Sequence, residues 1–155
     1  MVYINPEVMQ SLADRAARRQ ESFHELLSTA EEGDLDAAYR LGQCYYYGDD
    51  GAEEDEGKAF YWFAKAAAGD HISAQYSLGL CYARGAGTER DLTKAAELFA
   101  AAADQGYLPA LCELGLCYEL GHGVEENKLR AAELYREAAE QDFAPAQCNL
   151  GFFYF

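Results

Sequence analysis

Cysteine is the side chain with the most obvious chemistry in this chain, and its spacing predicts packing rather than reactivity. Cys44, Cys81 and Cys117 share one position of a recurring pattern, and Cys112 and Cys148 share another. If the pattern is a stack of helices, equivalent positions lie about 9–10 Å apart or more. A disulfide needs Cα atoms within about 7 Å. We therefore expect five reduced thiols, mostly buried as small apolar groups.

Histidine and the acidic residues also give no pattern typical of a reactive site. His24, His71 and His122 lack the close spacing of a metal site, and none pairs with a cysteine and a third orienting group. The acidic run from Asp49 to Glu56 lacks the alternating oxygen ligands and distal glutamate of a calcium loop. A solvated loop that stabilises the next helix N-terminus explains it better. We expect a protein that is not an enzyme and has no metal ion or cofactor.

The net charge of −15 over 155 residues restricts the partners. Such a field repels nucleic acid and anionic lipid and favours basic or neutral partners, although solubility alone would also explain it. We find no basic leader and no apolar run long enough to span a membrane. A cytoplasmic protein is the expectation, with an upstream leader removed beforehand as the alternative.

A recurring Leu-Gly pair sets the framework that positions these residues. Each glycine has an alanine five residues before it and a tyrosine three residues after it, and the glycines lie 37, 36 and 36 residues apart. A period of this length is typical of stacked helical repeats. The pairs are Leu41-Gly42, Leu78-Gly79, Leu114-Gly115 and Leu150-Gly151.

Each period divides into two amphipathic helices, A and B. The apolar spacing predicts helix A near 37–47, 74–84, 110–120 and from 146 onward, and helix B near 56–68, 92–105 and 128–141. Helix B has Asp55, Asp91 or Asn127 as its N-cap. A glycine inside helix A costs about 1 kcal/mol, so its recurrence predicts a closely packed neighbouring helix. The glycines expected to end the B-type helices in the left-handed conformation are Gly33, Gly69 and Gly106.

The whole pattern resembles the Sel-one-like repeat (Sel1-like repeat, SLR) family, a relative of the tetratricopeptide repeat. In the second copy it includes Ala74, Leu78-Gly79, Tyr82, Gly85-Ala-Gly87, Asp91, Lys94-Ala95, Ala102-Ala103 and Gly106. The resemblance implies an all-α, α/α solenoid with a right-handed superhelix of about three and a half repeats. It also implies adaptor or scaffold work. A secreted branch links helix B to the next helix A by a disulfide, and no cysteine lies in any predicted helix B here, which disfavours that branch.

The expected organisation is an N-terminal capping helical segment over residues 1–33 and a repeat array over residues 34–155. The array divides into 34–70, 71–106, 107–142 and a partial repeat, 143–155. Stacking of the A helices leaves one concave face, which we expect to bind a segment of another protein, including basic segments. Tyrosine suits such recognition because it combines a large contact area with a polar tip. The predicted partner-binding residues are Tyr39, Gln43, Tyr46, Tyr47, Tyr76, Leu80, Arg84, Cys112, Leu116, Glu119 and Phe152.

Three other interpretations remain open at this point. The same residues could simply pack between adjacent A helices. The chain could instead be a structural protein that forms a homodimer through Phe152, Phe153 and Phe155. A hydrolase or ligand-binding protein that uses the groove ranks last, because no catalytic pair accompanies it.

Overall fold

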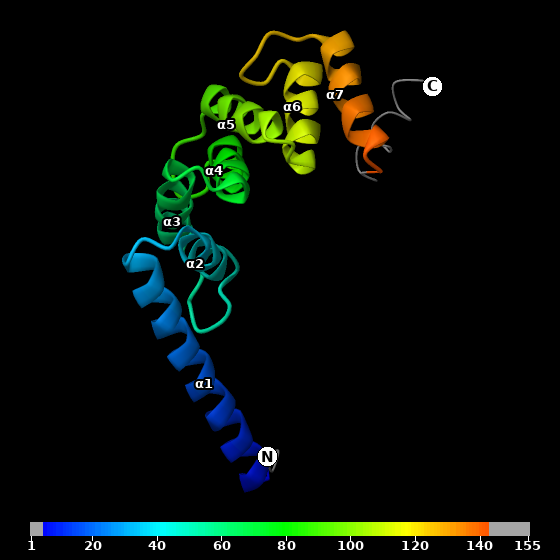
Figure 1. Ribbon diagram of the computed structural model, residues 1–155. Coiled ribbons are helices and arrows are strands. Elements are labelled where there is room, and N and C mark those ends of the chain that lie inside the picture. Colours follow the sequence, from blue (N-terminus) through cyan, green and yellow to red (C-terminus); the bar gives the residue numbers. More distant parts are fainter. Residues whose placement is uncertain (1–4, 143–155) are drawn as a thin grey trace.

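The computed structural model describes residues 5–142, and within that range seven α-helices follow one another along a bent path (Figure 1). Each helix packs mainly on the helices before and after it, as expected for stacked helical repeats. The all-α class is therefore confirmed. In order, the helices are α1 (Pro6–Glu31), α2 (Leu35–Tyr47), α3 (Glu56–Ala68), α4 (Ile72–Arg84), α5 (Leu92–Asp104), α6 (Leu108–Leu120) and α7 (Lys128–Glu140).

The second helix of each pair begins where its capping residue predicts. The side chains of Asp55, Asp91 and Asn127 each accept a hydrogen bond from the backbone N–H three residues later, at 2.9, 3.0 and 2.9 Å. This arrangement satisfies one of the N–H groups that a helix start leaves without a partner. The predicted starts of α3, α5 and α7 are confirmed, and in the described residues all three helices have the same length of 13 residues.

The first helix of each pair begins two residues earlier than predicted. The cap of α2 is Asp34, whose side chain accepts from the N–H of Ala37 at 2.7 Å. The cap of α4 is His71, whose Nδ1 accepts from the N–H of Ala74 at 3.1 Å. The recurring alanine therefore follows the cap by three residues and does not mark the helix start. An aspartate and a histidine act as the N-caps that define the true starts.

The recurring glycine is a point of close contact between the two helices of a pair. A Cβ atom built on it would lie 2.6–2.7 Å from an aromatic ring of the second helix, which is closer than real Cβ contacts. The close approach predicted from the cost of helical glycine is confirmed. The contacts are Gly42 with Phe63, Gly79 with Phe99, and Gly115 with Tyr135.

The predicted left-handed helix ends are confirmed at two positions and wrong at the third. Gly33 and Gly106 have φ values of 102° and 80°. Gly69 has a φ of −91°, and the left-handed residue is Asp70, with a φ of 66°. A Cβ on Gly69 would lie 2.5 Å from the Leu35 side chain. Glycine is therefore needed there for space, a requirement that looks the same in the sequence as a need for a left-handed conformation.

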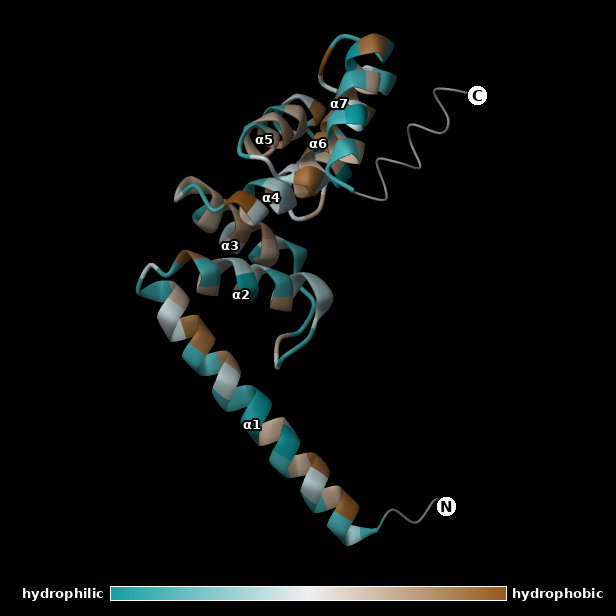
Figure 2. Ribbon diagram, turned by 45° about the vertical axis from the view of Figure 1, so that its right-hand side comes forward, coloured by the Kyte–Doolittle hydropathy of each residue, from teal (hydrophilic) through white to brown (hydrophobic). Residues whose placement is uncertain are grey.

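Helix α1 contacts the array only over its last turns. Phe23 and Ala30 are buried, whereas the residues from Pro6 to Ser22 are exposed. Figure 1 shows this part of α1 extending away from the other helices, and Figure 2 shows apolar residues along it. Arg19 and Gln20 also lie beside Gly51, so α1 packs on the array through its C-terminal half, and the capping role of residues 1–33 stays a prediction. No helix in the described part of the chain is both long enough and apolar enough to span a membrane.

Candidate functional site

A groove of about 270 Å³ lies where α2 faces α4. Helix α2 supplies residues spaced by three or four positions, which places them on one face, and α4 does the same. One ring from α3 and one from the start of α6 complete the groove. Its lining consists of Tyr39, Gln43, Tyr46, Tyr47, Phe63, Tyr76, Ser77, Leu80, Arg84 and Tyr107.

The tyrosine rings of the groove are held by other rings. Tyr39 stacks on His71 at a centroid distance of 4.8 Å and contacts Phe63 at 5.9 Å. Tyr76 packs edge-on against Tyr107 at 5.3 Å. Both Tyr39 and Tyr76 are partly buried. Because these contacts fix the rings, a ligand that packs on them would cost little further side-chain entropy.

Two polar contacts join α2 to α4 at the groove. Arg84 Nη1 donates a hydrogen bond to Tyr46 Oη at 3.1 Å. His71 Nε2 lies 2.9 Å from Asp36 Oδ1. Since His71 Nδ1 accepts the capping bond from Ala74, the neutral ring carries its proton on Nε2 and donates it to Asp36. These contacts fix the two walls of the groove relative to each other.

The groove carries one positive charge among neutral hydroxyl groups. Burial raises the pKa of Tyr76 to about 12, and Glu113 adds to the shift. Burial also raises the pKa of Tyr39. The hydrogen bond to Tyr46 raises the pKa of Arg84. At neutral pH Tyr39 and Tyr76 are therefore un-ionised, and Arg84 is charged.

Seven of the residues predicted from the sequence line this groove. They are Tyr39, Gln43, Tyr46, Tyr47, Tyr76, Leu80 and Arg84. Three others, Cys112, Leu116 and Glu119, lie on α6 and do not line it. Glu119 accepts a hydrogen bond from Tyr135 Oη at 2.9 Å. The last predicted residue, Phe152, and the self-association residues Phe153 and Phe155 lie outside the described part of the chain.

Sequence reasoning missed Phe63, Ser77 and Tyr107. Phe63 was assigned to the buried side of helix B, and its ring does pack there while also reaching the groove. Tyr107 is the N-cap residue of α6, and no side-chain hydrogen bond marks it as a cap. Its place two residues before Pro109 was the available signal, because proline favours the first turn of a helix.

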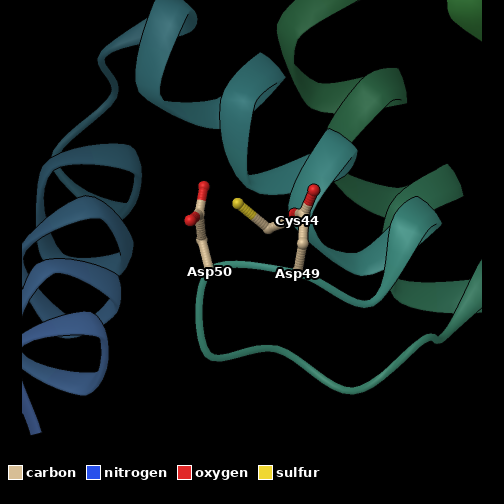
Figure 3. Close-up of side chains that lie close together, drawn as sticks. All are labelled: Cys44, Asp49 and Asp50. Carbon is tan, nitrogen blue, oxygen red and sulfur yellow. The ribbon is translucent and has the colours of Figure 1, made fainter. Parts of the chain in front are cut away.

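A second group of side chains, Cys44, Asp49 and Asp50, lies beside the end of α2 (Figure 3). Their sulfur and oxygen atoms lie within 4.8 Å of one another. A metal ion would require the thiolate of Cys44. Burial raises the pKa of this thiol, and the two aspartates raise it further. The N–H of Asp49 also donates to the carbonyl of Cys44 at 3.1 Å, so backbone packing already explains the proximity, and we assign no ion to this group.

Similar proteins with solved structures share this arrangement of helices. A Sel1 repeat protein from Oxalobacter formigenes is 30% identical and superposes with a TM-score of 0.81, covering 84% of this chain and 52% of that one. The protective antigen c5321 from uropathogenic Escherichia coli, which displays an SLR fold, is 29% identical with a TM-score of 0.78. That superposition covers 98% of this chain and 36% of the antigen.

Sequence comparison agrees with the structural one. The chain is 36% identical over 77 residues to HRD3A of Arabidopsis thaliana, an ERAD-associated E3 ubiquitin-protein ligase component. That match covers 50% of this chain and only 11% of HRD3A. The sequence profile of the Sel1 repeat matches residues 35–71, 72–107, 108–143 and 144–155. The chain therefore belongs to the Sel1 repeat family.

Proposed function

We propose that this protein is an adaptor module whose groove between α2 and α4 binds a segment of another protein. The observation that carries the proposal is the groove itself: five tyrosines gather around one cavity of about 270 Å³. Sel1 repeat proteins generally mediate protein–protein interactions and are typically non-catalytic scaffolds. HRD3A, which resembles this chain over two repeats' length, is named as a component of a larger ligase.

The groove suits a peptide segment for a physical reason. Tyrosine offers a broad apolar face and a hydroxyl tip, and it has few rotatable bonds. Each 100 Å² of apolar surface that a ligand covers would contribute about 2.5 kcal/mol before the costs of association are subtracted. Because Tyr39 and Tyr76 are already held by neighbouring rings, less of that gain is lost in ordering them.

Neither alternative has an observation in its favour. A hydrolase needs a nucleophile and a base within reach of each other. Among the described residues, the groove lining contains the hydroxyl of Ser77 but no histidine, carboxylate or lysine to act as its base, and adjacent His71 is engaged by Ala74 and Asp36. Self-association through Phe152, Phe153 and Phe155 concerns residues outside the described range.

Site-specific crosslinking tests the proposal. A photoreactive amino acid replaces Tyr47, which is 67% exposed at the groove, and in a matched variant it replaces Leu129, which is 81% exposed on α7. We expect the Tyr47 position to crosslink a partner protein in an extract of the native cell. The crosslink should disappear when Tyr39→Ala and Tyr76→Ala are added. Equal crosslinking from Leu129, or crosslinking that survives both substitutions, would contradict a groove-based adaptor.

A further inference from the structure

We propose that the segment bound in the groove carries an acidic side chain, Asp or Glu, which Arg84 and Tyr46 recognise together. This inference rests on the proposed function and specifies the partner's chemistry. Among the residues that line the groove, Arg84 is the only charged one. Among the charged side chains of an unmodified peptide, only the carboxylates of Asp and Glu therefore meet a complementary charge there.

The donors for a carboxylate are present and available. A guanidinium has five N–H groups, and one nitrogen of Arg84 bonds to Tyr46 Oη. Within the described residues, Arg84 makes no ion pair. The Tyr46 hydroxyl accepts from Arg84, so its own hydrogen can point to a ligand. One carboxylate can then accept from the guanidinium of α4 and the hydroxyl of α2, and charge-assisted bonds of this kind are the stronger ones.

The net charge of −15 does not oppose this inference at short range. At physiological ionic strength, exposed charges more than about 8 Å apart are largely screened from each other. The overall negative field slows the encounter with an acidic segment, whereas Arg84 acts on the carboxylate in direct contact. The sequence-based preference for a basic partner came from the sum of charges, and the structure shows which charge faces the groove.

One carboxylate of the protein does act on Arg84. Glu113 on α6 is partly buried, burial raises its pKa, and Arg84 lowers it. It lies beyond ion-pair distance from Arg84, so it leaves the guanidinium open while repelling a second carboxylate. Replacing its carboxyl group by an uncharged amide of similar size, in Glu113→Gln, removes this repulsion and should therefore raise the affinity for an acidic segment.

The acidic group is expected inside the segment rather than at its C-terminus. A second cavity of about 240 Å³ shares Gln43 and Tyr47 with the groove. A bound chain therefore has room to continue past the Gln43 and Tyr47 side of the groove. Peptides with amidated C-termini separate the two sources of a carboxylate, because amidation removes the terminal charge and leaves side chains unchanged.

The test selects ligands from a displayed library of random linear peptides, using the full chain as bait. Selected peptides are then synthesised with amidated C-termini, and their affinities are measured by fluorescence anisotropy. We expect enrichment of Asp or Glu at one fixed position beside apolar residues. Changing that residue to its amide should weaken binding about tenfold, and Arg84→Glu should do the same and should select Lys or Arg instead. Arg15→Glu on exposed α1 makes the same change in net charge and should leave affinity within about twofold.

The outcomes separate this inference from the proposed function. Peptides that are lost with Tyr39→Ala and Tyr76→Ala, but show no acidic preference and ignore Arg84→Glu, would overturn the inference and leave the adaptor intact. Peptides that bind only when their C-terminus is free would also overturn it. Peptides that ignore the tyrosine substitutions, or a failure to select any peptide, would contradict both. Circular dichroism spectra of each variant establish that loss of binding is not loss of folding.

Discussion

The α2–α4 end and the α6 end of the array share one framework and differ in their surface. At both ends a helical glycine receives an aromatic ring from the second helix of the pair, at Gly79 as at Gly115. At the α2–α4 end, the positions flanking the core carry tyrosines and Arg84, and they enclose a groove. On α6 the positions equivalent to Tyr39, Gln43 and Tyr46 of α2 are Cys112, Leu116 and Glu119, and they do not line it. The repeat thus determines the fold, and the positions free to vary determine where a ligand can bind.

The difference also depends on which way the polar groups face. Arg84 reaches across from α4 to the hydroxyl of Tyr46 on α2, so its charge lies in the groove. Glu119 on α6 instead accepts the hydroxyl of the buried Tyr135 on α7. The Arg84 charge therefore faces the groove, whereas the Glu119 carboxylate is used inside a helix pair. The following substitutions test this division between a shared framework and a local site.

The largest expected effect is the loss of the shared framework. Valine at either glycine, in Gly79→Val or Gly115→Val, would clash with an aromatic ring. A Cβ on Gly79 would lie 2.7 Å from the Phe99 ring, and a Cβ on Gly115 would lie 2.6 Å from the Tyr135 ring. We expect each substitution to lower the free energy of unfolding by about 2 kcal/mol or more, because a tightly packed core resists added volume. Urea denaturation measures this. Gly57→Ala, at an exposed helical glycine where an added Cβ would lie 3.3 Å from Asp55 Oδ1, should change the free energy of unfolding by less than about 1 kcal/mol. A stable Gly115→Val variant would show that the two ends are built differently.

The next effect separates the two surfaces. Tyr39→Ala removes a ring from the groove and should weaken a groove-binding peptide about tenfold, whereas Leu116→Ala on α6 should change affinity less than about twofold. Leu116 is 39% exposed, so its truncation should leave folding intact. Titration of a labelled peptide against both variants measures the contrast. Equal losses would show that the binding surface extends from the groove onto α6.

Loss of a helix cap should have a smaller effect, equal at both ends. Asp91 and Asn127 cap α5 and α7 with bonds of 3.0 and 2.9 Å. Replacement of either by alanine should lower the free energy of unfolding by about 1 kcal/mol without changing peptide affinity. Thermal or urea unfolding, together with a binding titration, would detect both results. A cap variant that stays folded but no longer binds the peptide would contradict the separation of the shared framework from the binding site.

The smallest effect concerns alkaline pH. The pKa of Tyr76 in the folded protein is raised from 10.0 to about 12, mainly by burial. A raised pKa contributes stability that is complete below about pH 10 and is lost as pH rises from about 10 to 12, because the unfolded chain ionises first. Urea midpoints should therefore fall over this range. Tyr76→Phe should make the fall shallower, and an unchanged slope would show that Tyr76 titrates normally.

Most of the fold was predictable from local features of the sequence. The repeat period indicated stacked helices, the N-cap residues marked the starts of the B helices, and the helical glycines indicated close contacts between helices. Helix B starts followed directly from Asp55, Asp91 and Asn127. Gly69 was misassigned because a glycine needed for space and a glycine needed for a left-handed turn are identical in sequence. The exposure of α1 on the N-terminal side of Phe23 was also not predictable. An exposed helix and a capping helix can show the same spacing of apolar residues.

The site was predictable only in part, and the reason is geometric. Residues on one face of α2 or α4 follow from helical spacing, so Tyr39, Tyr46 and Tyr76 were identified. Phe63 and Tyr107 come from other helices, and their approach depends on how the pairs stack. The preference for a basic partner stays a prediction, because a net charge sums over the whole surface, whereas among the residues that line the groove only Arg84 is charged.

Nuclear magnetic resonance mapping of a selected peptide on the labelled chain tests the central claim most directly. We predict chemical-shift changes at Tyr39, Tyr76 and Arg84, with none beyond error at Leu116 or on α1. A footprint centred on α6 or on α1 would contradict the claim that α2 and α4 form the binding groove.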